Sequence, residues 1–185
     1  MTTPHTDPAE TSAFNSLLGE QVGHEFTASQ QYVAIAVWYD QQALPQLAAH
    51  FYAQALEERN HAMMLVQYLM DREVPVTIPG VPEVANAWTS IEEPIALALQ
   101  QERRVTHQFE VLIATARTDG DYLGEQFTHW FLKEQVEEVA SMSTLLQVAD
   151  RCVDNPLLLE DYLAREGGSG EAADPTAPHP AGGPV

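Results

Sequence analysis

The sequence predicts an all-α protein, a four-helix bundle with one long crossover and a short C-terminal fifth helix. Three observations predict this fold. Apolar residues recur at intervals of three and four along four long segments, which is the period of an amphipathic helix. Short turn signals separate segments one and two and segments three and four, whereas 18 residues separate segments two and three. Each apolar stripe also contains one glutamate that should face the core.

The first helix is expected from Ser12, whose hydroxyl can cap its start, to about Asp40. Its stripe consists of Phe14, Leu18, Gln21, Glu25, Ala28, Tyr32, Ile35 and Tyr39. The second helix is expected from Pro45, a residue suited to the first helical position, to about Glu73. Its stripe consists of Leu47, Phe51, Ala55, Glu58, His61, Leu65 and Tyr68 or Leu69.

The connection at residues 74–91 contains three prolines and a glycine, which leave it too broken for a helix. The third helix is expected at about 92–118, with a stripe of Ile95, Leu99, Glu102, Val105, Phe109, Ile113 and Ala116. A turn at Asp119-Gly120-Asp121 precedes the fourth helix, expected at about 122–153. Its stripe consists of Leu123, Phe127, Trp130 or Phe131, Glu134, Glu138, Met142, Leu145 and Ala149.

These elements divide the chain into three regions. Residues 1–11 are polar, contain two prolines and are expected to form a flexible N-terminal arm. Residues 12–166 are expected to form one domain, closed by a fifth helix that Asn155 and Pro156 can start. Residues 167–185 are rich in proline and glycine and contain no aromatic residue, so a disordered tail is expected there.

The four inward glutamates are expected in one layer of the bundle. Glu25 lies about as far before the first turn as Glu58 lies after it. Glu102 and Glu138 each lie eighteen residues from Gly120. The 18-residue crossover can stretch to roughly 59 Å, more than the roughly 40 Å length of a helix here, so it can return along the bundle.

A dry layer of carboxylates needs a counter-charge, because an unpaired buried carboxylate is strongly destabilising. Four carboxylates and a neutral imidazole carry a formal charge of −4, which two divalent cations balance. Oxygen ligands with one nitrogen favour Fe(II) or Mn(II) over a structural zinc site. We expect the first ion at Glu25, Glu58 and His61, and the second at Glu58, Glu102 and Glu138. Gln135, one turn before Glu138, is expected to orient ligands or water.

The composition limits the remaining functions. A net charge of −19 over 185 residues argues against nucleic acid and anionic membranes as partners and favours cations. No apolar run reaches membrane-spanning length and no basic segment precedes an apolar one, so a cytoplasmic protein is expected. The single cysteine, Cys152, excludes an internal disulfide and a cysteine-based metal site.

The same residues resemble the motifs of the bacterial non-haem ferritins. The resemblance rests on Glu58-Arg59-Asn60-His61, on Glu25 with Tyr32 seven residues later, on Glu102, and on Glu134-Gln135-Val136-Glu137-Glu138. It covers about residues 12–166. The combination is specific, whereas a lone Glu-x-x-His pair would be a weak signal.

The resemblance implies an iron-storage protein with ferroxidase activity. In that family O₂ or H₂O₂ oxidises paired Fe(II) ions, and Fe(III) collects as a mineral inside a hollow shell of 24 subunits. The resemblance also implies a third iron site at Glu57, Glu134 and Glu137 and a redox role for Tyr32. Spacing alone fits solvated charges for the three glutamates and a core aromatic with a hydrogen-bonded hydroxyl for Tyr32.

Two departures place the chain within the wider superfamily. Ser141 stands where di-iron bundles usually carry the histidine of a second Glu-x-x-His pair, and Arg59 stands where bacterioferritins carry a haem-ligating methionine. We therefore expect no haem. Rubrerythrin-like peroxidases would need paired cysteine motifs, which this sequence lacks.

Two other functions fit the same residues. A di-iron oxidase or peroxidase acting on an organic substrate would use the same ligands, and a helical cage with protonated glutamates would need no metal. The fifth helix suggests a docking element, and the tail leaves open a protein partner. Four histidines lie off the stripes or at their edges and are expected at the surface: His24, His50, His107 and His129.

Overall fold

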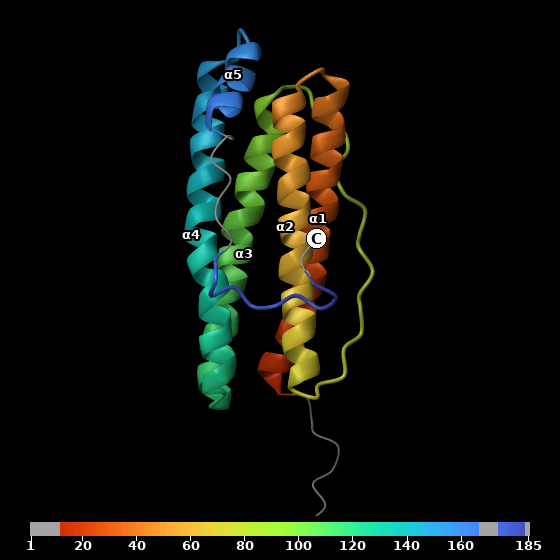
Figure 1. Cartoon of the computed structure of the whole chain (residues 1–185), viewed down its shortest axis with the longest axis vertical. Helices are drawn as coiled ribbons and strands as arrows, with labels where there is room; N and C mark the ends of the chain where they lie inside the picture. The colour runs from red at the N-terminus through yellow and green to blue at the C-terminus, as the bar shows by residue number, and fades with distance from the viewer. Residues whose placement is uncertain (1–11, 167–173, 184–185) are drawn as a thin grey trace, which may run out of the picture.

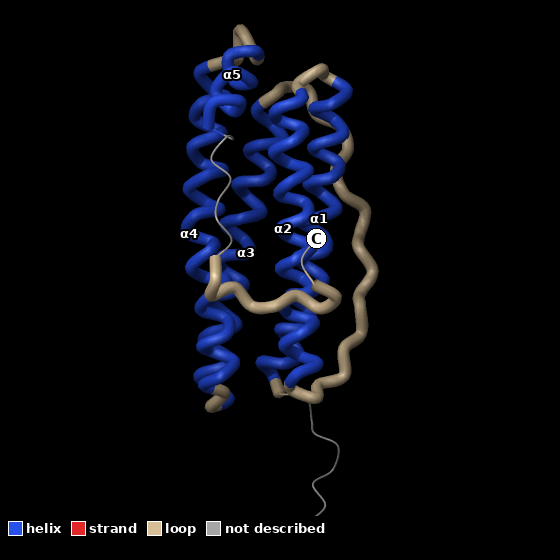
Figure 2. The backbone as a smooth tube through the Cα atoms, viewed as in Figure 1, coloured by secondary structure: helices blue, strands red, loops and turns tan. Residues whose placement is uncertain are grey.

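The computed structural model describes residues 12–166 and 174–183, so the arm at residues 1–11 lies outside the described part. Within these residues it contains five helices and no strand (Figures 1 and 2). The helices are α1 (Ala13–Gln41), α2 (Pro45–Asp71), α3 (Glu92–Asp119), α4 (Tyr122–Arg151) and α5 (Leu157–Glu166). The predicted all-α bundle with a short fifth helix is confirmed. None of the described helices is long and apolar enough to cross a membrane.

The long helices form two antiparallel pairs, α1 with α2 and α3 with α4, and α1 also packs against α3. The crossover from α2 to α3 returns along the outside of the bundle beside α1 (Figure 1). Gly23 allows its close approach, because a Cβ atom there would lie 3.0 Å from Pro79. The buried amide of Gln31 holds the segment by donating to the carbonyl of Ala85 and accepting from its N–H, both at 2.9 Å.

Side chains accept hydrogen bonds from the first backbone N–H groups of α1 and α4, which have no partner within the helix. At α1, Ser12 Oγ accepts from the N–H of Asn15 at 3.2 Å, as the sequence predicts, and Asp119 accepts from the N–H of Phe14 at 2.9 Å. At α4, Asp121 accepts from the N–H of Gly124 at 2.9 Å. These contacts set where each helix begins along the bundle.

The start of α2 has no side-chain cap of its own, and Glu160 of α5 supplies one. The two oxygens of this buried carboxylate accept from the N–H groups of Gln46 at 2.8 Å and Leu47 at 2.9 Å. A carboxylate is favourable there because the N-terminal end of a helix carries partial positive charge. The contact docks α5 against the bundle.

Replacing Glu160 by alanine is expected to lower the free energy of unfolding by about 1–2 kcal/mol, the usual effect of losing a helix N-cap. Chemical denaturation followed by circular dichroism would measure it. Asp161→Ala is the matched control, because this neighbouring acid is exposed on the same helix. Equal losses in the two variants would show that the cap contributes nothing.

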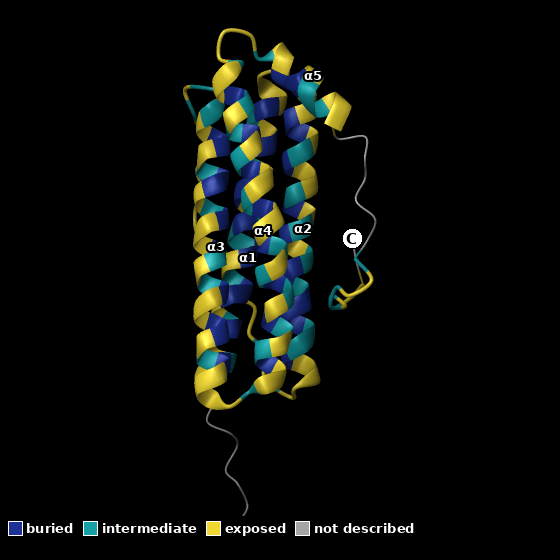
Figure 3. Cartoon of the chain, turned by 90° about the vertical axis from the view of Figure 1, so that its left-hand side faces the viewer, coloured by how far each residue is buried: buried dark blue, intermediate teal, exposed yellow. Residues whose placement is uncertain are grey.

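The core consists of two apolar clusters separated along the bundle. One cluster includes Tyr39, Phe51 and Leu145, next to α5, and the other includes Phe14, Leu69 and Phe109, at the opposite end. Buried residues face inward along all four long helices (Figure 3). The gap between the clusters is occupied by buried polar side chains, which are described below.

The beginning of α4 differs from the prediction. Leu123, expected on the buried stripe, is 67% exposed, and Gly124 and Thr128 face the core in its place. The reason is steric, since a Cβ atom on Gly124 would lie 2.5 Å from the ring of Phe14. The small residue therefore takes the inner position, and the apolar leucine points outward.

Residues 174–183 of the tail also differ from the predicted disorder. They cross from α4 to α2 (Figure 1), where the N–H of Ala181 donates to the carbonyl of Met63 at 3.0 Å. Asp174 accepts from Trp130 Nε1 at 3.3 Å and pairs with Lys133 Nζ at 3.2 Å. These polar contacts, together with the packing of the partly buried Ala177 and Ala181 against the core, hold a segment for which composition alone predicts no contacts. The rest of the tail lies outside the described residues.

Candidate metal centre

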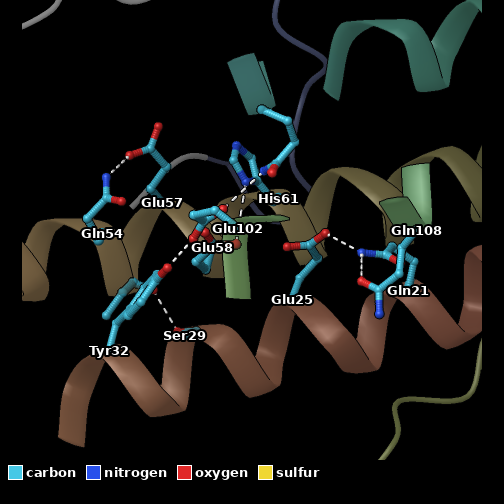
Figure 4. Close-up of polar contacts among 12 residues, drawn as sticks. Gln21, Glu25, Ser29, Tyr32, Gln54, Glu57, Glu58, His61, Glu102 and Gln108 are labelled. Atoms are coloured by element: carbon cyan, nitrogen blue, oxygen red, sulfur yellow. Dashed lines mark hydrogen bonds and ion pairs between the residues drawn. The ribbon is translucent and has the colours of Figure 1, made fainter. Parts of the chain in front are cut away.

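The buried polar layer lies between the two apolar clusters and contains the five side chains predicted as ligands. All are at most 8% exposed: Glu25, Glu58, His61, Glu102 and Glu138. They come from α1, α2, α3 and α4. Figure 4 shows the glutamates of α1, α2 and α3 converging with His61 in the middle of the bundle. The buried layer thus contains the glutamates that lie at equal distances from the turns in the sequence.

Three of these side chains form a close group. One ligand atom each from Glu25, Glu58 and His61 lies within 4.8 Å of the others. The Oε2 atoms of both glutamates are shielded from solvent and have no hydrogen-bond partner. Buried carboxylate oxygens without a donor need a proton or a cation, so this donor set fits a bound divalent ion.

Electrostatics lead to the same conclusion. Burial raises the pKa of Glu25 well above its ordinary value, and repulsion by Glu58 raises it further. Burial also raises the pKa of Glu58, with a further contribution from Glu102. Without a cation, the centre therefore holds protons that bound metal would displace.

Glu102 is held by two hydrogen bonds. The hydroxyl of Tyr32 donates to Glu102 Oε1, and Gln135 Nε2 donates to Glu102 Oε2 at 3.3 Å. Thr106 Oγ1 donates to Gln135 Oε1 at 3.0 Å, which fixes the orientation of the amide. Burial raises the pKa of Tyr32 well above its ordinary value, so the phenol remains a proton donor. Gln135 thus orients Glu102 directly.

The ligand atoms of the second predicted set, Glu58, Glu102 and Glu138, do not lie as close together as those of the first set. Among the described residues, the group of donor atoms within 4.8 Å includes neither Glu102 nor Glu138. Burial raises the pKa of Glu102, while the hydrogen bonds from Tyr32 and Gln135 lower it. The structure therefore shows one preformed three-donor group, with two further buried carboxylates in the same layer.

The three outer glutamates lie beside the centre and do not join that group. Glu57, Glu134 and Glu137 line a cavity of about 630 Å³, called here the tail cavity, together with His61 and Trp130. Six residues of the tail also line it: Asp174, Pro175, Ala177, Pro178, His179 and Pro180. Glu57 accepts from Gln54 Nε2 at 2.8 Å, and Glu134 pairs with Lys133 at 3.6 Å.

Two contacts were not predicted from the sequence. Gln21, one turn before Glu25 on the same stripe, donates to Glu25 Oε1 at 2.8 Å and to Gln108 Oε1 at 3.2 Å. The ring of Trp130 lies edge-on to His61, with centroids 5.8 Å apart. The position of Gln21, four residues before the buried Glu25 on the same helix face, could have predicted the first contact. Nothing in the spacing distinguished the second.

The fold and the centre together define a four-helix bundle whose buried carboxylates and one histidine are arranged so that they could hold a metal ion. Residues 15–152 match the family described as the ferritin-like domain. The chain belongs to this family, as the sequence resemblance implies.

Curated relatives agree with this assignment. The chain is 61% identical to ferritin BfrB of Mycolicibacterium smegmatis over 170 residues, which cover 92% of this chain and 93% of the relative. It is 59% identical, over equal shares, to a Mycobacterium tuberculosis protein named bacterioferritin BfrB. It is 36% identical to the bacterial non-heme ferritin of Staphylococcus saprophyticus, over 78% of this chain and 87% of that one.

Solved structures confirm the fold. An open-pore ferritin from Archaeoglobus fulgidus superposes with a TM-score of 0.80 at 24% identity, covering 85% of this chain and 96% of that one. An iron-soaked variant of the protein PmFTN superposes with a TM-score of 0.77 at 28% identity, covering 82% of this chain and 97% of that one. Family membership and the buried Glu/His group assign the chain to iron storage with ferroxidase activity, with iron as the substrate.

Proposed function

We propose that the chain is a non-haem ferritin whose ferroxidase centre binds two Fe(II) ions in the buried polar layer. The observation that carries the proposal is the pair of shielded carboxylate oxygens, Glu25 Oε2 and Glu58 Oε2, beside His61. The first ion is assigned to Glu25, Glu58 and His61, and the second to Glu58, Glu102 and Glu138. Two divalent ions balance the four buried carboxylates, and Glu58 bridges them.

The surrounding residues prepare this centre for iron. Gln21 and Gln135 hold Glu25 and Glu102 by hydrogen bonds, so that less conformational entropy is lost when metal binds. Two Fe(II) ions would give one electron each, and with two protons these electrons convert O₂ to H₂O₂ or H₂O₂ to two water molecules. Tyr32, which donates to Glu102, is one protonated group beside the centre that can supply a proton. The redox role that the resemblance implies for Tyr32 stays a prediction.

The outer glutamates give oxidised iron a way out of the centre. Glu57, Glu134 and Glu137 line the tail cavity together with His61, a ligand of the first ion. Carboxylates at this position fit the third iron site that the family resemblance implies. The missing histidine at Ser141 would leave the second ion with oxygen ligands alone, which favours its departure.

The non-haem assignment rests on two residues. Arg59 is exposed and cannot provide the thioether ligand that haem iron takes from methionine. Ser141 is exposed and offers no imidazole to the pair. The relatives are named both ferritin and bacterioferritin. The choice between a non-haem and a haem protein is therefore argued from these two residues and not from the names.

A homo-oligomeric shell is part of the proposal. Large apolar side chains are exposed on α1, α2 and α5, among them Val37, Tyr52, Leu56, Leu157 and Leu158. Exposed apolar side chains favour protein–protein contacts. A shell of 24 subunits in the cytoplasm, storing a ferric mineral, is the assembly that the family resemblance implies.

Anaerobic protein mixed with Fe(II) and then exposed to O₂ tests this function. We expect oxygen uptake in proportion to added iron, followed by sedimentation of the iron with a particle of shell size. Uptake that depends on an organic substrate would indicate a di-iron oxidase. Absence of both uptake and metal binding would indicate a helical cage without a metal centre.

A further inference from the structure

The tail cavity is lined by one sulfur-containing side chain, Met64 of α2. Met64 follows His61 by three residues, so the two side chains are neighbours on one face of the helix. Both line the tail cavity. The cavity therefore places a methionine thioether beside a residue that is assigned as a ligand of the first ion.

Met64 is largely shielded from bulk solvent. Its exposed fraction is 9%, and Ala177 and Ala181 of the tail pack against the apolar cluster that contains it. Met70, six residues further along the same helix, is 47% exposed. An oxidant dissolved in bulk solvent should therefore react with Met70 before it reacts with Met64.

Two other methionines separate nearness to the centre from access to the cavity. Met142 follows Glu138, a predicted ligand, by four residues, but it is fully buried in the other apolar cluster. Met63 precedes Met64 and is only partly exposed. Neither Met142 nor Met63 lines the tail cavity. Among the methionines of the described part of the chain, Met64 thus combines nearness to the centre with an adjoining space that a small molecule can occupy.

The proposed ferroxidase reaction supplies an oxidant at this place. Two Fe(II) ions and two protons convert O₂ to H₂O₂, and a thioether reduces H₂O₂ without a further co-reactant. The sulfur attacks one peroxide oxygen, and the O–O bond breaks. The sulfur loses two electrons and keeps that oxygen, while the other oxygen leaves as water with both protons.

We propose that Met64 is a modification site, oxidised to methionine sulfoxide by H₂O₂ that forms at the metal centre and enters the tail cavity. The proposal rests on the proposed function, which supplies the peroxide. Oxidation of Met64 consumes one peroxide per chain before that peroxide leaves the cavity. The sulfoxide is polar, so it also weakens the packing of the tail against the apolar cluster that contains Met64.

Mass spectrometry of each methionine after iron oxidation tests the site. The full chain, freed of metal, is mixed with Fe(II) and O₂ in the presence of catalase, which destroys peroxide that has left the protein. Fragmentation of the peptide separates Met63 from Met64. We expect sulfoxide at Met64 to exceed that at Met70 and Met142 several-fold. H₂O₂ added without iron or catalase should give more sulfoxide at Met70 than at Met64.

Two variants complete the test. Glu58→Gln, which is expected to lose rapid iron oxidation, should lose the sulfoxide at Met64 under the same conditions. Met70→Leu is the matched control, because it removes an exposed methionine from the same helix and should leave the oxidation of Met64 unchanged.

Oxygen uptake without an excess of sulfoxide at Met64 would overturn this proposal and leave the proposed function intact. Equal oxidation of Met64 in Glu58→Gln would also overturn it, since the oxidant would then not come from the centre. Absence of oxygen uptake would contradict the proposed function, and the oxidation of Met64 with it.

Discussion

Replacing Glu58 by glutamine is expected to lower the initial rate of Fe(II) oxidation by more than about 100-fold. Residues that only orient ligands cost 10–100-fold in many metal sites, and Glu58 is assigned as a ligand of both ions. The amide keeps the volume of the side chain and removes the negative charge that holds the ions together. Stopped-flow absorbance after mixing with Fe(II) and O₂ measures the rate.

Asp71→Asn is the matched control for this variant. Asp71 is an exposed acid at the end of α2, does not line the tail cavity and lies outside the Glu25–Glu58–His61 group. It should leave the first oxidation burst close to that of the unmodified protein. Equal losses in the two variants would show that general acidity of α2, and not a bridging ligand, supports oxidation.

Metal binding is expected to stabilise the protein strongly, and more so as pH rises. The pKa values of Glu25, Glu58 and Glu102 are raised in the folded protein, chiefly by burial. On these three groups the native state therefore binds more protons than the unfolded state above about pH 4.5, so their contribution to the stability of the metal-free protein falls as pH increases. A divalent ion replaces those protons and removes the loss.

The expected size follows from linkage. Metal at 100 times its dissociation constant adds about 2.7 kcal/mol per site, or roughly 5–10 °C in melting temperature for a domain of this size. Calorimetry of metal-free and Mn(II)-loaded protein between pH 5 and pH 8 measures the difference at each pH. It should grow with pH in the unmodified protein and grow less in Glu58→Gln.

Exposed carboxylates that form ion pairs do not reverse the expected growth of metal stabilisation with pH. Hydrogen bonds from Arg72 lower the pKa of Asp121, and those from Arg117 lower the pKa of Glu125, so both favour the folded state above their ordinary pKa. Their contribution is complete by about pH 5 and is constant above it. A melting temperature that is independent of metal at pH 8 would contradict a buried, metal-binding centre.

The sequence predicted the fold and the layer of acids because both follow from periodicity. Glu102 and Glu138 are equidistant from Gly120, and antiparallel pairing places equidistant residues at one level. In the structure this level is the polar layer, with one apolar cluster on each side of it. The helix starts at Ser12, which caps α1, and at Pro45, which occupies the first turn of α2, followed from residue preferences that are local.

What the sequence did not predict depends on contacts between distant segments. Gly124 faces the core because Phe14 of α1 occupies the adjacent space, and no local pattern in α4 contains that information. His50, which spacing alone placed at the surface, is only partly exposed and lines one cavity with Tyr162 and Leu163 of α5. The packed part of the tail depends on Asp174 meeting Trp130 and Lys133 of α4.

Anomalous diffraction at the iron edge tests the central claim most directly, using crystals soaked in ferrous salt without oxygen. The account predicts two neighbouring peaks, one contacting Glu25, Glu58 and His61 and the other contacting Glu58, Glu102 and Glu138. A single surface peak, or none among these side chains in crystals that bind iron elsewhere, would contradict it.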